Sequence, residues 1–398
     1  MKKHQNLPDE CTACTSCVVH CPVAAVTSKF RGPKLSGPAL ERYRLLLHDE
    51  DPSLEYCSNC KNCDITCPSG VSPSTMNMLA RGEYYKKHPH RLRDWILAHA
   101  EKMGQMNSPM AAVANMGADN PLTRIALKKI GITTKRRLPK YASRTFVSQF
   151  RALKQQSYPD KIVFFPGCFI NYNDPQVGMD FVAVMQANRY EVIVPDDTEC
   201  CGSPMVAGGY LEEAAANAQK NIQALRRLTD KGYPVITCCT SCGLMLKREY
   251  QELFRIDGVE TVAARLYDST EFLLELYDQG RLNTGFIRQN GKYLYHAPCH
   301  LRAQGIGRPA LELLRLLPDI EITDADAGCC GISGSYGFKD DKYDISMAIG
   351  EDLFRTIRES GADGVVSDCG TCRMQIAHGT GARTLHPMTL VANGYGKR

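Results

Sequence analysis

The chain has 398 residues, 43% of them hydrophobic, and a formal net charge of +5. This length permits two or three domains with ordinary cores. Because no run of about 18 apolar residues occurs, we predict no transmembrane helix. The N-terminal sequence MKKHQNLPDE also lacks the apolar segment of a signal peptide. The 19 cysteines are numerous and odd in number, which suits a disulfide framework poorly. We therefore expect a reducing cytoplasm and thiolates committed to metal.

Two copies of one cysteine pattern lie between residues 11 and 68. Each reads Cys-x-x-Cys-x-x-Cys-x-x-x-Cys-Pro, the spacing with which bacterial-type ferredoxins hold [4Fe–4S] clusters. In two-cluster ferredoxins the fourth cysteine of each motif ligates the other cluster. We therefore predict one cluster on Cys11, Cys14, Cys17 and Cys67, and a second on Cys57, Cys60, Cys63 and Cys21. The alternatives are zinc sites or disulfides, which would not need the repeated Cys-Pro ending.

Helical patterns surround the two motifs. Proline favours the first position of a helix, so a helix is predicted from Pro38 through ALERYRLLL. Ser72 and Pro73 start a second predicted helix through STMNMLARGEYYKK, and a third follows through RLRDWILAHAEKM. Helices rather than a hairpin between the motifs predict an α-helical ferredoxin domain over residues 1–80.

Residues 81–155 form a basic connector, with sixteen Lys and Arg side chains against four acidic ones. Asn120 and Pro121 begin a predicted helix that ends at Gly131 and carries an apolar face. We expect the connector to contact an anionic membrane surface or an acidic partner subunit. The alternative is a solvated linker packed over a domain boundary. Nucleic acid is not expected, because no recognisable binding motif occurs and aromatic residues do not alternate with the charges.

The rest of the chain is a tandem duplication. Cys168, Cys200 and Cys242 have counterparts at Cys299, Cys329 and Cys372, with nearly constant spacing. Strand-like and helical segments alternate in each copy, which predicts a parallel sheet in each. The cysteines follow the strands, where open α/β sheets bind their ligands. The predicted fold class is thus α+β multidomain: an α-helical ferredoxin domain, the connector, and two cysteine-rich α/β repeats over residues 156–285 and 286–398.

Each repeat offers five cysteines, including an adjacent pair followed by glycine. They are Cys168, Cys200, Cys201, Cys239 and Cys242 in the first, and Cys299, Cys329, Cys330, Cys369 and Cys372 in the second. Five thiols exceed what one cubane cluster or one zinc ion needs, and adjacent thiolates could bridge irons in a more open cluster. An iron–sulfur cluster, a reactive dithiol and buried structural cysteines all remain open.

Three further residues near these cysteines are candidates for supporting roles. Cys238 has no counterpart, since Asp368 occupies the matching place, so Cys238 is either spare or an alternative to Cys239. His296 and His300 flank Cys299 and could deliver protons or tune a sulfur, or could simply pack. No flavin or nicotinamide fingerprint and no Ser/His/Asp arrangement occurs, so we assign no catalytic residue.

Taken together, the paired ferredoxin motifs and the two CCG repeats resemble the C subunit of anaerobic glycerol-3-phosphate dehydrogenase. The resemblance runs essentially end to end and includes FFPGCFINYNDPQVG at 164–178, LPKY at 138–141 and CCGISGSYGFK at 329–339. It implies a non-catalytic electron-transfer subunit in glycerol metabolism and anaerobic respiration. Its partners would be a flavoprotein dehydrogenase subunit, an accessory subunit and membrane quinone. The location would be peripheral, on the cytoplasmic side of the cytoplasmic membrane.

The CCG module is also similar to that of the B subunit of heterodisulfide reductase, in which five cysteines hold a noncubane [4Fe–4S] cluster. This likeness implies one or two such clusters here besides the two cubanes. Glycolate and lactate oxidase iron–sulfur subunits share the architecture. The alternatives are therefore such an oxidase subunit, a heterodisulfide-reductase-like thiol/disulfide reductase, or a structural membrane anchor whose CCG sites hold no metal.

Overall fold

Two four-stranded parallel sheets organise the C-terminal part of the chain in a computed structural model that describes residues 8–47 and 50–397. The first sheet has the order β2-β1-β3-β4 and the second the order β6-β5-β7-β8. The strands are β1 (Asp160–Phe164), β2 (Tyr190–Ile193), β3 (Val235–Thr237), β4 (Leu266–Asp268), β5 (Gly291–Tyr295), β6 (Ile320–Asp324), β7 (Gly364–Val366) and β8 (Thr384–Leu385). The matching order confirms the predicted duplication. The two very short edge strands β4 and β8 were not predicted from the sequence.

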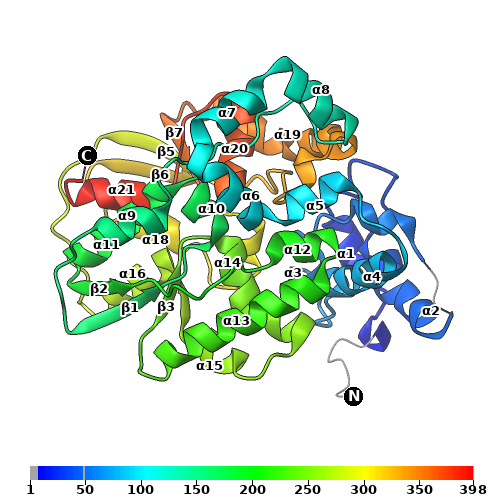
Figure 1. Ribbon diagram of the computed structural model, residues 1–398, viewed down its shortest axis with the longest axis horizontal. Helices are drawn as coiled ribbons and strands as arrows, with labels where there is room; N and C mark the ends of the chain where they lie inside the picture. The colour runs from blue at the N-terminus through cyan, green and yellow to red at the C-terminus, as the bar shows by residue number, and fades with distance from the viewer. Residues whose placement is uncertain (1–7, 48–49, 398) are drawn as a thin grey trace.

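Helices cover both sheets (Figure 1). In the first repeat they are α10 (Gly167–Tyr172), α11 (Pro175–Ala187), α12 (Ser203–Gly208), α13 (Leu211–Thr229), α14 (Thr240–Leu244), the π-helix η5 (Met245–Phe254), α15 (Val259–Ala263) and α16 (Ser269–Asp278). In the second they are α17 (Cys299–Arg302), α18 (Pro309–Leu314), η6 (Tyr336–Phe338), η7 (Asp340–Lys342), α19 (Tyr343–Glu359), α20 (Gly370–Thr380) and α21 (Pro387–Gly394).

The two repeats bury a common apolar core. Helix α11 of the first repeat packs against α21 of the second, and α16 of the first packs against α18 of the second. One cluster of buried residues accordingly takes in Phe181 and Leu273 from the first repeat and Leu314 and Val391 from the second. Because the apolar faces of the two repeats cover each other, the two sheets are held in one fixed relation.

The two cysteine loops of the ferredoxin part have the same backbone conformation. Ala13 and Thr15 have φ values of 58° and 66°, and Asn59 and Lys61 have values of 54° and 65°. Left-handed backbone at non-glycine residues is strained and persists where the surrounding structure requires it. The helices here are η1 (Pro8–Glu10), α1 (Ser16–Val19), η2 (Leu35–Ala39), α2 (Leu40–Leu47), η3 (Pro52–Tyr56), α3 (Asn62–Ile65) and α4 (Pro73–Lys87). The α-helical character predicted for this part is confirmed.

The connector contains α5 (Leu92–Ala98), α6 (Ala100–Asn107), η4 (Ser108–Met110), α7 (Ala111–Asp119), α8 (Pro121–Lys129) and α9 (Phe146–Ala152). The single helix expected over 91–103 is wrong, because the backbone leaves the helical region at His99 (φ −100°, ψ 49°). The predicted start of α8 is confirmed, since the Asn120 side chain accepts a hydrogen bond from the Leu122 amide at 2.9 Å.

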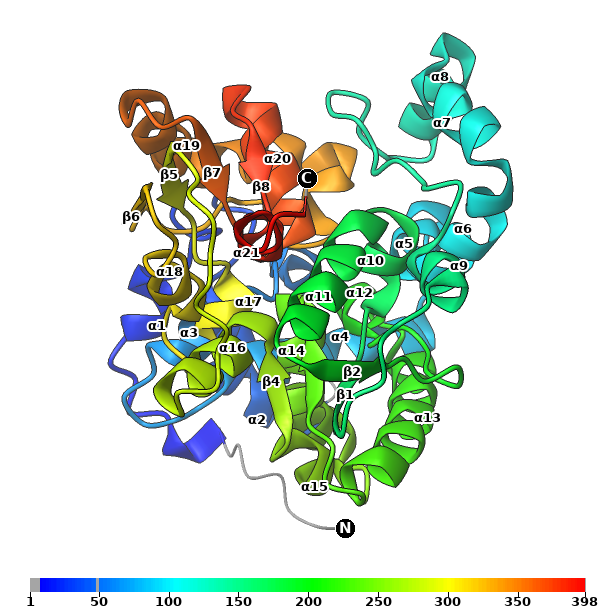
Figure 2. The ribbon, with the colours of Figure 1, turned by 90° about the vertical axis from the view of Figure 1, so that its left-hand side faces the viewer.

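The connector has a packed portion and a projecting portion. Helices α5 and α6 pack on α12 and α10 of the first repeat. Helices α7 and α8 instead stand out from the body of the molecule (Figure 2), and α8 has no buried residue. Within the described ranges, no helix is both long and apolar enough to cross a bilayer.

Candidate metal centres

Four cysteines from both ferredoxin motifs line one small cavity. Cys11, Cys14 and Cys17 come from the first loop and Cys67 from the second. Burial raises the pKa of the Cys17 thiol, and the three neighbouring thiols raise it further. Four thiols around one cavity match the ligand number of a [4Fe–4S] cluster, so the donor set fits that group. Cys14 is exposed and Cys11 and Cys67 are half-buried, which places this site at the surface.

The other four ferredoxin cysteines, Cys21, Cys57, Cys60 and Cys63, are all buried. Burial raises the pKa of Cys21 to about 11, and Cys57 adds to the rise. Two N–H groups face these sulfurs: the Ala24 amide lies 3.5 Å from Cys21 Sγ, and Asn77 Nδ2 lies 3.6 Å from Cys57 Sγ. Donors of this kind tune the potential of an iron–sulfur cluster, so this buried set also fits such a group.

In the first repeat the five cysteines follow β1, β2 and β3. The Sγ atoms of Cys168 and Cys200 lie 3.7 Å apart. A hydrogen bond from Cys242 lowers the pKa of Cys239. Gly167, with φ 66°, brings the chain so close that an added Cβ would lie 2.6 Å from Cys242 Sγ. The carboxyl ends of the parallel strands therefore gather all five thiols at one edge of the sheet.

The second repeat gathers its five cysteines in the same way. The Sγ atoms of Cys330 and Cys372 lie 3.2 Å apart, and the Gly331 amide lies 3.4 Å from Cys329 Sγ. Cys369 Sγ lies 3.3 Å from Thr371 Oγ1. All 19 cysteines have free thiols. Dense sets of thiols without disulfides suit soft metal centres in both repeats.

The pKa pattern of the thiols is the same in the two repeats. A hydrogen bond from Cys168 holds the pKa of Cys200 well below its ordinary value, and one from Cys299 does the same for Cys329. A hydrogen bond from Cys372 lowers the pKa of Cys369 to about 5. The thiolate is the metal-binding form of cysteine. Each repeat therefore presents thiolates that are prepared to bind metal.

The four groups of cysteines follow one another through the molecule. After burial itself, Cys57 and then Cys17 raise the pKa of Cys21, so the surface and buried ferredoxin sets are neighbours. Burial and then Cys329 raise the pKa of Cys60, which places the buried set beside the second repeat. The pKa of Cys239 is lowered overall, but Cys369 of the second repeat acts to raise it, so the sites of the two repeats are neighbours. Electrostatic interactions therefore link the surface set to the buried set, the buried set to the second repeat, and the second repeat to the first.

A buried ion pair supports the junction between the ferredoxin part and the first repeat. Lys61 Nζ lies 2.7 Å from Glu249 Oε1, and both side chains are almost fully buried. Lys61 belongs to the loop between Cys60 and Cys63, and Glu249 belongs to η5. Because a buried charge without its partner is strongly destabilising, this pair fixes the loop against η5.

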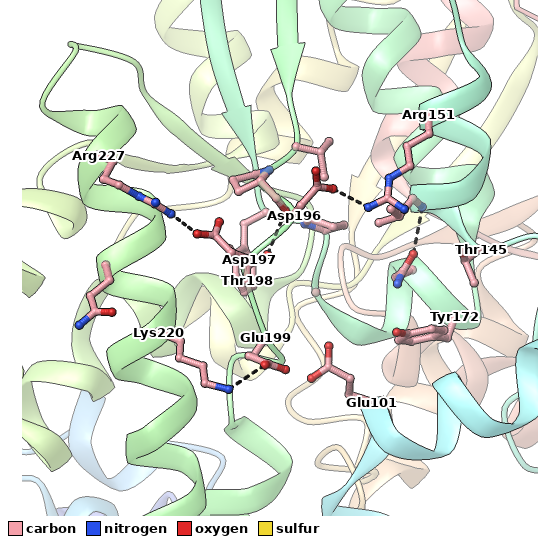
Figure 3. A pocket seen from close by; sticks show the side chains of 18 of the residues that line it. Glu101, Thr145, Arg151, Tyr172, Asp196, Asp197, Thr198, Glu199, Lys220 and Arg227 are labelled. Carbon is pink, nitrogen blue, oxygen red and sulfur yellow. Dashed lines mark hydrogen bonds and ion pairs between the residues drawn. The ribbon is translucent and has the colours of Figure 1, made fainter.

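A cleft of about 1060 Å³ opens beside the site of the first repeat (Figure 3). Gly167 and Glu199, the neighbours of Cys168 and Cys200, belong to its wall. The segment after β2 carries acidic residues that pair with cations on either side of it: Arg151 Nη2 lies 2.6 Å from Asp196 Oδ1, and Lys220 and Arg227 pair with Glu199 and Asp197. Apolar residues such as Phe165 and Val194 complete the lining. A ligand with both polar and apolar parts could approach the first repeat's thiols through this cleft.

Several residues that hold the first Cys-Cys-Gly loop were not singled out from the sequence. Glu101 Oε2, from the connector helix α6, accepts a hydrogen bond from the Cys200 amide at 2.7 Å. Burial raises the pKa of Glu101 to about 7, and Cys200 adds to the rise. Tyr250 donates to the Cys201 carbonyl at 3.0 Å, and Asn221 in turn donates to Tyr250. These contacts join distant segments and leave no local sequence signal.

The three residues near the cysteines that were candidates for supporting roles have different surroundings in the structure. Cys238 is buried in the core shared by the repeats, with its thiol facing Ser269, and Cys239 alone faces the other thiols. His300 hydrogen-bonds Ser241 of the first repeat and Asn59 of the ferredoxin loop. His296 is buried beside Cys330 and Cys372. Burial lowers the pKa of His296 to about 4, so its ring is neutral.

Two cysteine loops followed by two thiol-rich parallel sheets define an iron–sulfur protein with a dicluster domain and two CCG domains. Residues 8–71 match the 4Fe-4S dicluster domain family, which implies two [4Fe–4S] clusters, and residues 162–247 and 293–377 match the cysteine-rich (CCG) domain family. The C subunit of anaerobic glycerol-3-phosphate dehydrogenase from Escherichia coli (strain K12) is 39% identical over 391 residues, 96% of this chain and 98% of that protein. The chain belongs to the family of this C subunit, and membership of such a family implies further subunits.

Other relatives share the architecture at lower identity. The B subunit of fumarate reductase (CoM/CoB) from Methanothermobacter marburgensis is 27% identical over 378 residues, 92% of this chain and 67% of that protein. Lactate utilization protein A 2 from Bacillus cereus (strain AH820) is 26% identical over 250 residues, 60% of this chain and 100% of that protein. A crystal structure of glutamate racemase from Francisella tularensis aligns with a TM-score of 0.26 at 14% identity, covering 59% of this chain and 78% of that one.

Proposed function

We propose that this chain carries electrons within a glycerol-3-phosphate dehydrogenase complex, from a flavoprotein subunit to membrane quinone. The observation that supports this most strongly is the unbroken succession of four thiol sites through the molecule. Iron–sulfur clusters on such sites would form a relay, because each site directly neighbours the next. The accessory subunit predicted for the complex would complete it.

Each ferredoxin site takes ligands from both motifs in this proposal. Cys11, Cys14, Cys17 and Cys67 hold the surface cluster, and Cys57, Cys60, Cys63 and Cys21 hold the buried one. The shared cavity of the first set and the mutual pKa effects within each set support this crossed assignment. Cys21 and Cys67 would thereby fix the separation of the two clusters.

Each CCG repeat holds one further noncubane [4Fe–4S] cluster on its five cysteines. The lowered pKa values of Cys200, Cys329 and Cys369 support metal ligation over inert structural thiols. An iron–sulfur cluster supplies one-electron transfer when bound. The protein's own contribution is to shield the centres from water and to hold the thiols of both repeats beside one another.

Electrons would enter through a cluster held by the surface cysteines and would leave through one held by the first repeat. Entry is supported by the exposure of Cys14, which lets a flavoprotein approach this cluster and no other ferredoxin cluster. Exit is supported by the cleft beside Cys168 and Cys200, whose mixed lining suits a quinone head group. A thiol/disulfide reductase would use the same cleft. The electron-transfer and reductase functions are distinguished by the electron donor and acceptor that the complex uses.

The projecting hairpin of α7 and α8 anchors the complex to the membrane. Its exposed apolar side chains include Val113, Met116, Leu122 and Ile125, between 55% and 77% exposed. Lys128 and Lys129 lie in the last turn of α8. Apolar side chains next to basic ones suit the interface of an anionic bilayer. The cleft and the hairpin are close along the chain, because helix α6 contributes Glu101 to the cleft lining and leads into the hairpin. Quinone could therefore reach the cleft from the membrane.

Metal content and substrate-driven reduction test the proposal. Anaerobically purified chain is expected to contain about sixteen irons, four for each of four clusters, against about eight if only the ferredoxin part is loaded. In the complex copurified with its partner subunits, glycerol 3-phosphate is expected to reduce the clusters. Iron near zero with zinc in its place would rule out electron transfer. Reduction by lactate or glycolate alone would assign the chain to an oxidase of those acids.

A further inference from the structure

His296 is buried among the thiols of the second repeat. It lies just after β5 and is 3% exposed. One of its ring nitrogens and the Sγ atoms of Cys330 and Cys372 all lie within 4.8 Å of one another. Cys329 is a third thiol close enough to interact electrostatically with the ring. An imidazole and several thiols facing one point form a ligand set for a soft metal.

The other deeply buried histidines have their ring nitrogens engaged by the protein. His99 has Nδ1 2.8 Å from the Trp95 carbonyl oxygen and Nε2 3.0 Å from Glu213 Oε2. His386 has Nε2 3.0 Å from the Cys238 carbonyl oxygen and Nδ1 3.1 Å from the Met388 amide.

His296 differs from both of these. Across the described ranges, only burial and nearby charges act on its ring, and no hydrogen bond does. A metal ion would provide a partner for the ring nitrogen that carries a lone pair.

The first repeat has no such ring. Its position matching His296 is Phe165, in the aligned segments KIVFFPGC and KYLYHAPC. The two backbones are equivalent, because the Phe165 amide donates to the Ile236 carbonyl and the His296 amide donates to the Val366 carbonyl, both at 2.9 Å. The duplication thus places an inert ring beside one set of thiols and a potential ligand beside the other.

We propose that His296 is a nitrogen ligand to iron in the second repeat's centre, whereas the first repeat's centre has thiolate ligands only. This inference rests on the proposed function, in which both repeats hold iron–sulfur clusters. If the imidazole takes the place of one thiolate, the reduction potential of the cluster rises, as in Rieske centres. The two otherwise equivalent centres would then differ in potential, and the second repeat's centre would be the more easily reduced.

Nitrogen hyperfine coupling tests the ligand directly. The full chain is labelled with ring-15N histidine, purified anaerobically, reduced with dithionite and examined by pulsed EPR. The strong 15N coupling of a directly bound nitrogen is expected in the unmodified chain. It should disappear in His296→Phe, which installs the residue found in the first repeat. It should persist in His378→Phe, a partly exposed histidine that hydrogen-bonds Tyr343.

A second variant covers the case in which His296→Phe loses the whole cluster. His296→Cys keeps a ligand at the position, so iron content should be retained while the 15N coupling is lost and the midpoint potential moves negative. About sixteen irons without histidine coupling, or coupling that survives in His296→Cys, would overturn this inference and leave the proposed function intact. About eight irons would overturn the CCG clusters of the proposed function, and this inference with them.

Discussion

The Nε2 atom of His300 donates a hydrogen bond of 3.0 Å to the carbonyl oxygen of Asn59. Asn59 lies between Cys57 and Cys60, so a residue of the second repeat holds the loop of the buried ferredoxin site. Because the carbonyl can only accept, Nε2 carries a proton, and in the neutral ring Nδ1 accepts from the Ser241 hydroxyl at 2.9 Å. One side chain thereby joins the ferredoxin loop, the first repeat and the second repeat.

Replacing His300 is expected to loosen this junction. His300→Ala removes two hydrogen bonds at a partly buried site and should lower the free energy of unfolding by about 1–3 kcal/mol. The EPR signal of the cluster on Cys57, Cys60 and Cys63 should broaden as the loop gains freedom. Denaturant midpoints and EPR measure both effects, with His378→Ala as the control. An unchanged midpoint and an unchanged signal would contradict a role for His300 in the junction.

Cys67→Ser and Cys21→Ser should damage opposite clusters. If the ligands cross between motifs, Cys67→Ser weakens the cluster held mainly by Cys11, Cys14 and Cys17, and Cys21→Ser weakens the buried one. EPR of anaerobically prepared variants reads out which signal is lost. Cys238→Ser, at a buried cysteine outside all four sites, should leave both signals in place. Loss of the buried cluster's signal in Cys67→Ser would show that each motif ligates its own cluster.

Neutralising the hairpin should release the protein from anionic liposomes. Each Lys or Arg near such a surface contributes about 1 kcal/mol, so Arg124, Lys128 and Lys129 changed together to Gln should weaken binding by about two orders of magnitude. Leu122→Asp should weaken it further by placing a charge in the apolar interface. Liposome cosedimentation at fixed salt measures both.

The control for this experiment comes from the same basic stretch. Lys135 is paired with Asp344 at 2.8 Å, and Arg136 is buried against Phe338 and Tyr343. Arg136 is therefore not available to lipid, although the basic stretch as a whole suggested membrane contact. Lys135→Gln should leave liposome binding nearly unchanged. A loss as large as that of the hairpin variant would move the contact surface away from α7 and α8.

His386 should make stability depend on pH in the mildly acidic range. Burial lowers its pKa from the ordinary 6.5 to about 3. Between these values the unfolded chain binds a proton that the folded chain does not, so stability falls as pH falls below 6.5. The expected slope for this residue is about 1.4 kcal/mol per pH unit. Denaturant midpoints across this range should fall less steeply in His386→Gln, and equal slopes would contradict the assignment.

Gly331 and Gly328 form a matched pair for testing the second Cys-Cys-Gly loop. Both have left-handed backbone, with φ values of 87° and 75°, but only Gly331 has a neighbour that a Cβ would strike, the Ser346 carbonyl oxygen. Gly328→Ala should cost about 1–2 kcal/mol from backbone strain alone. Gly331→Ala should cost clearly more and should lower the iron content of the second repeat. Equal losses of thermal stability in the two variants would show that the close approach is unimportant.

The features that could be predicted well from the sequence are local ones. The cysteine motifs between Cys11 and Cys67 can be recognised from residues that are close in the sequence, because one turning loop can direct several thiolates to one point. The duplication follows from constant offsets, and the longer strands and helices follow from their apolar patterns. The short strands β4 and β8 escaped prediction because, unlike the similarly short β3 and β7, they carry no pair of adjacent β-branched apolar residues. The break at His99 also escaped prediction; its ring contacts Glu213 and Tyr210, which are distant in the sequence.

The cysteine motifs, the two repeats and the family can all be recognised without a structure. Which sites are neighbours cannot be recognised from the sequence, since the electrostatic interaction between Cys60 and Cys329 depends on how the ferredoxin loop packs beside the second repeat. Folding also determines that Cys239 rather than Cys238 faces the other thiols, and that His300 holds the ferredoxin loop while His296 faces sulfur. These outcomes need the folded chain because a side chain's partners are set by burial against distant segments, for which adjacent residues carry no signal.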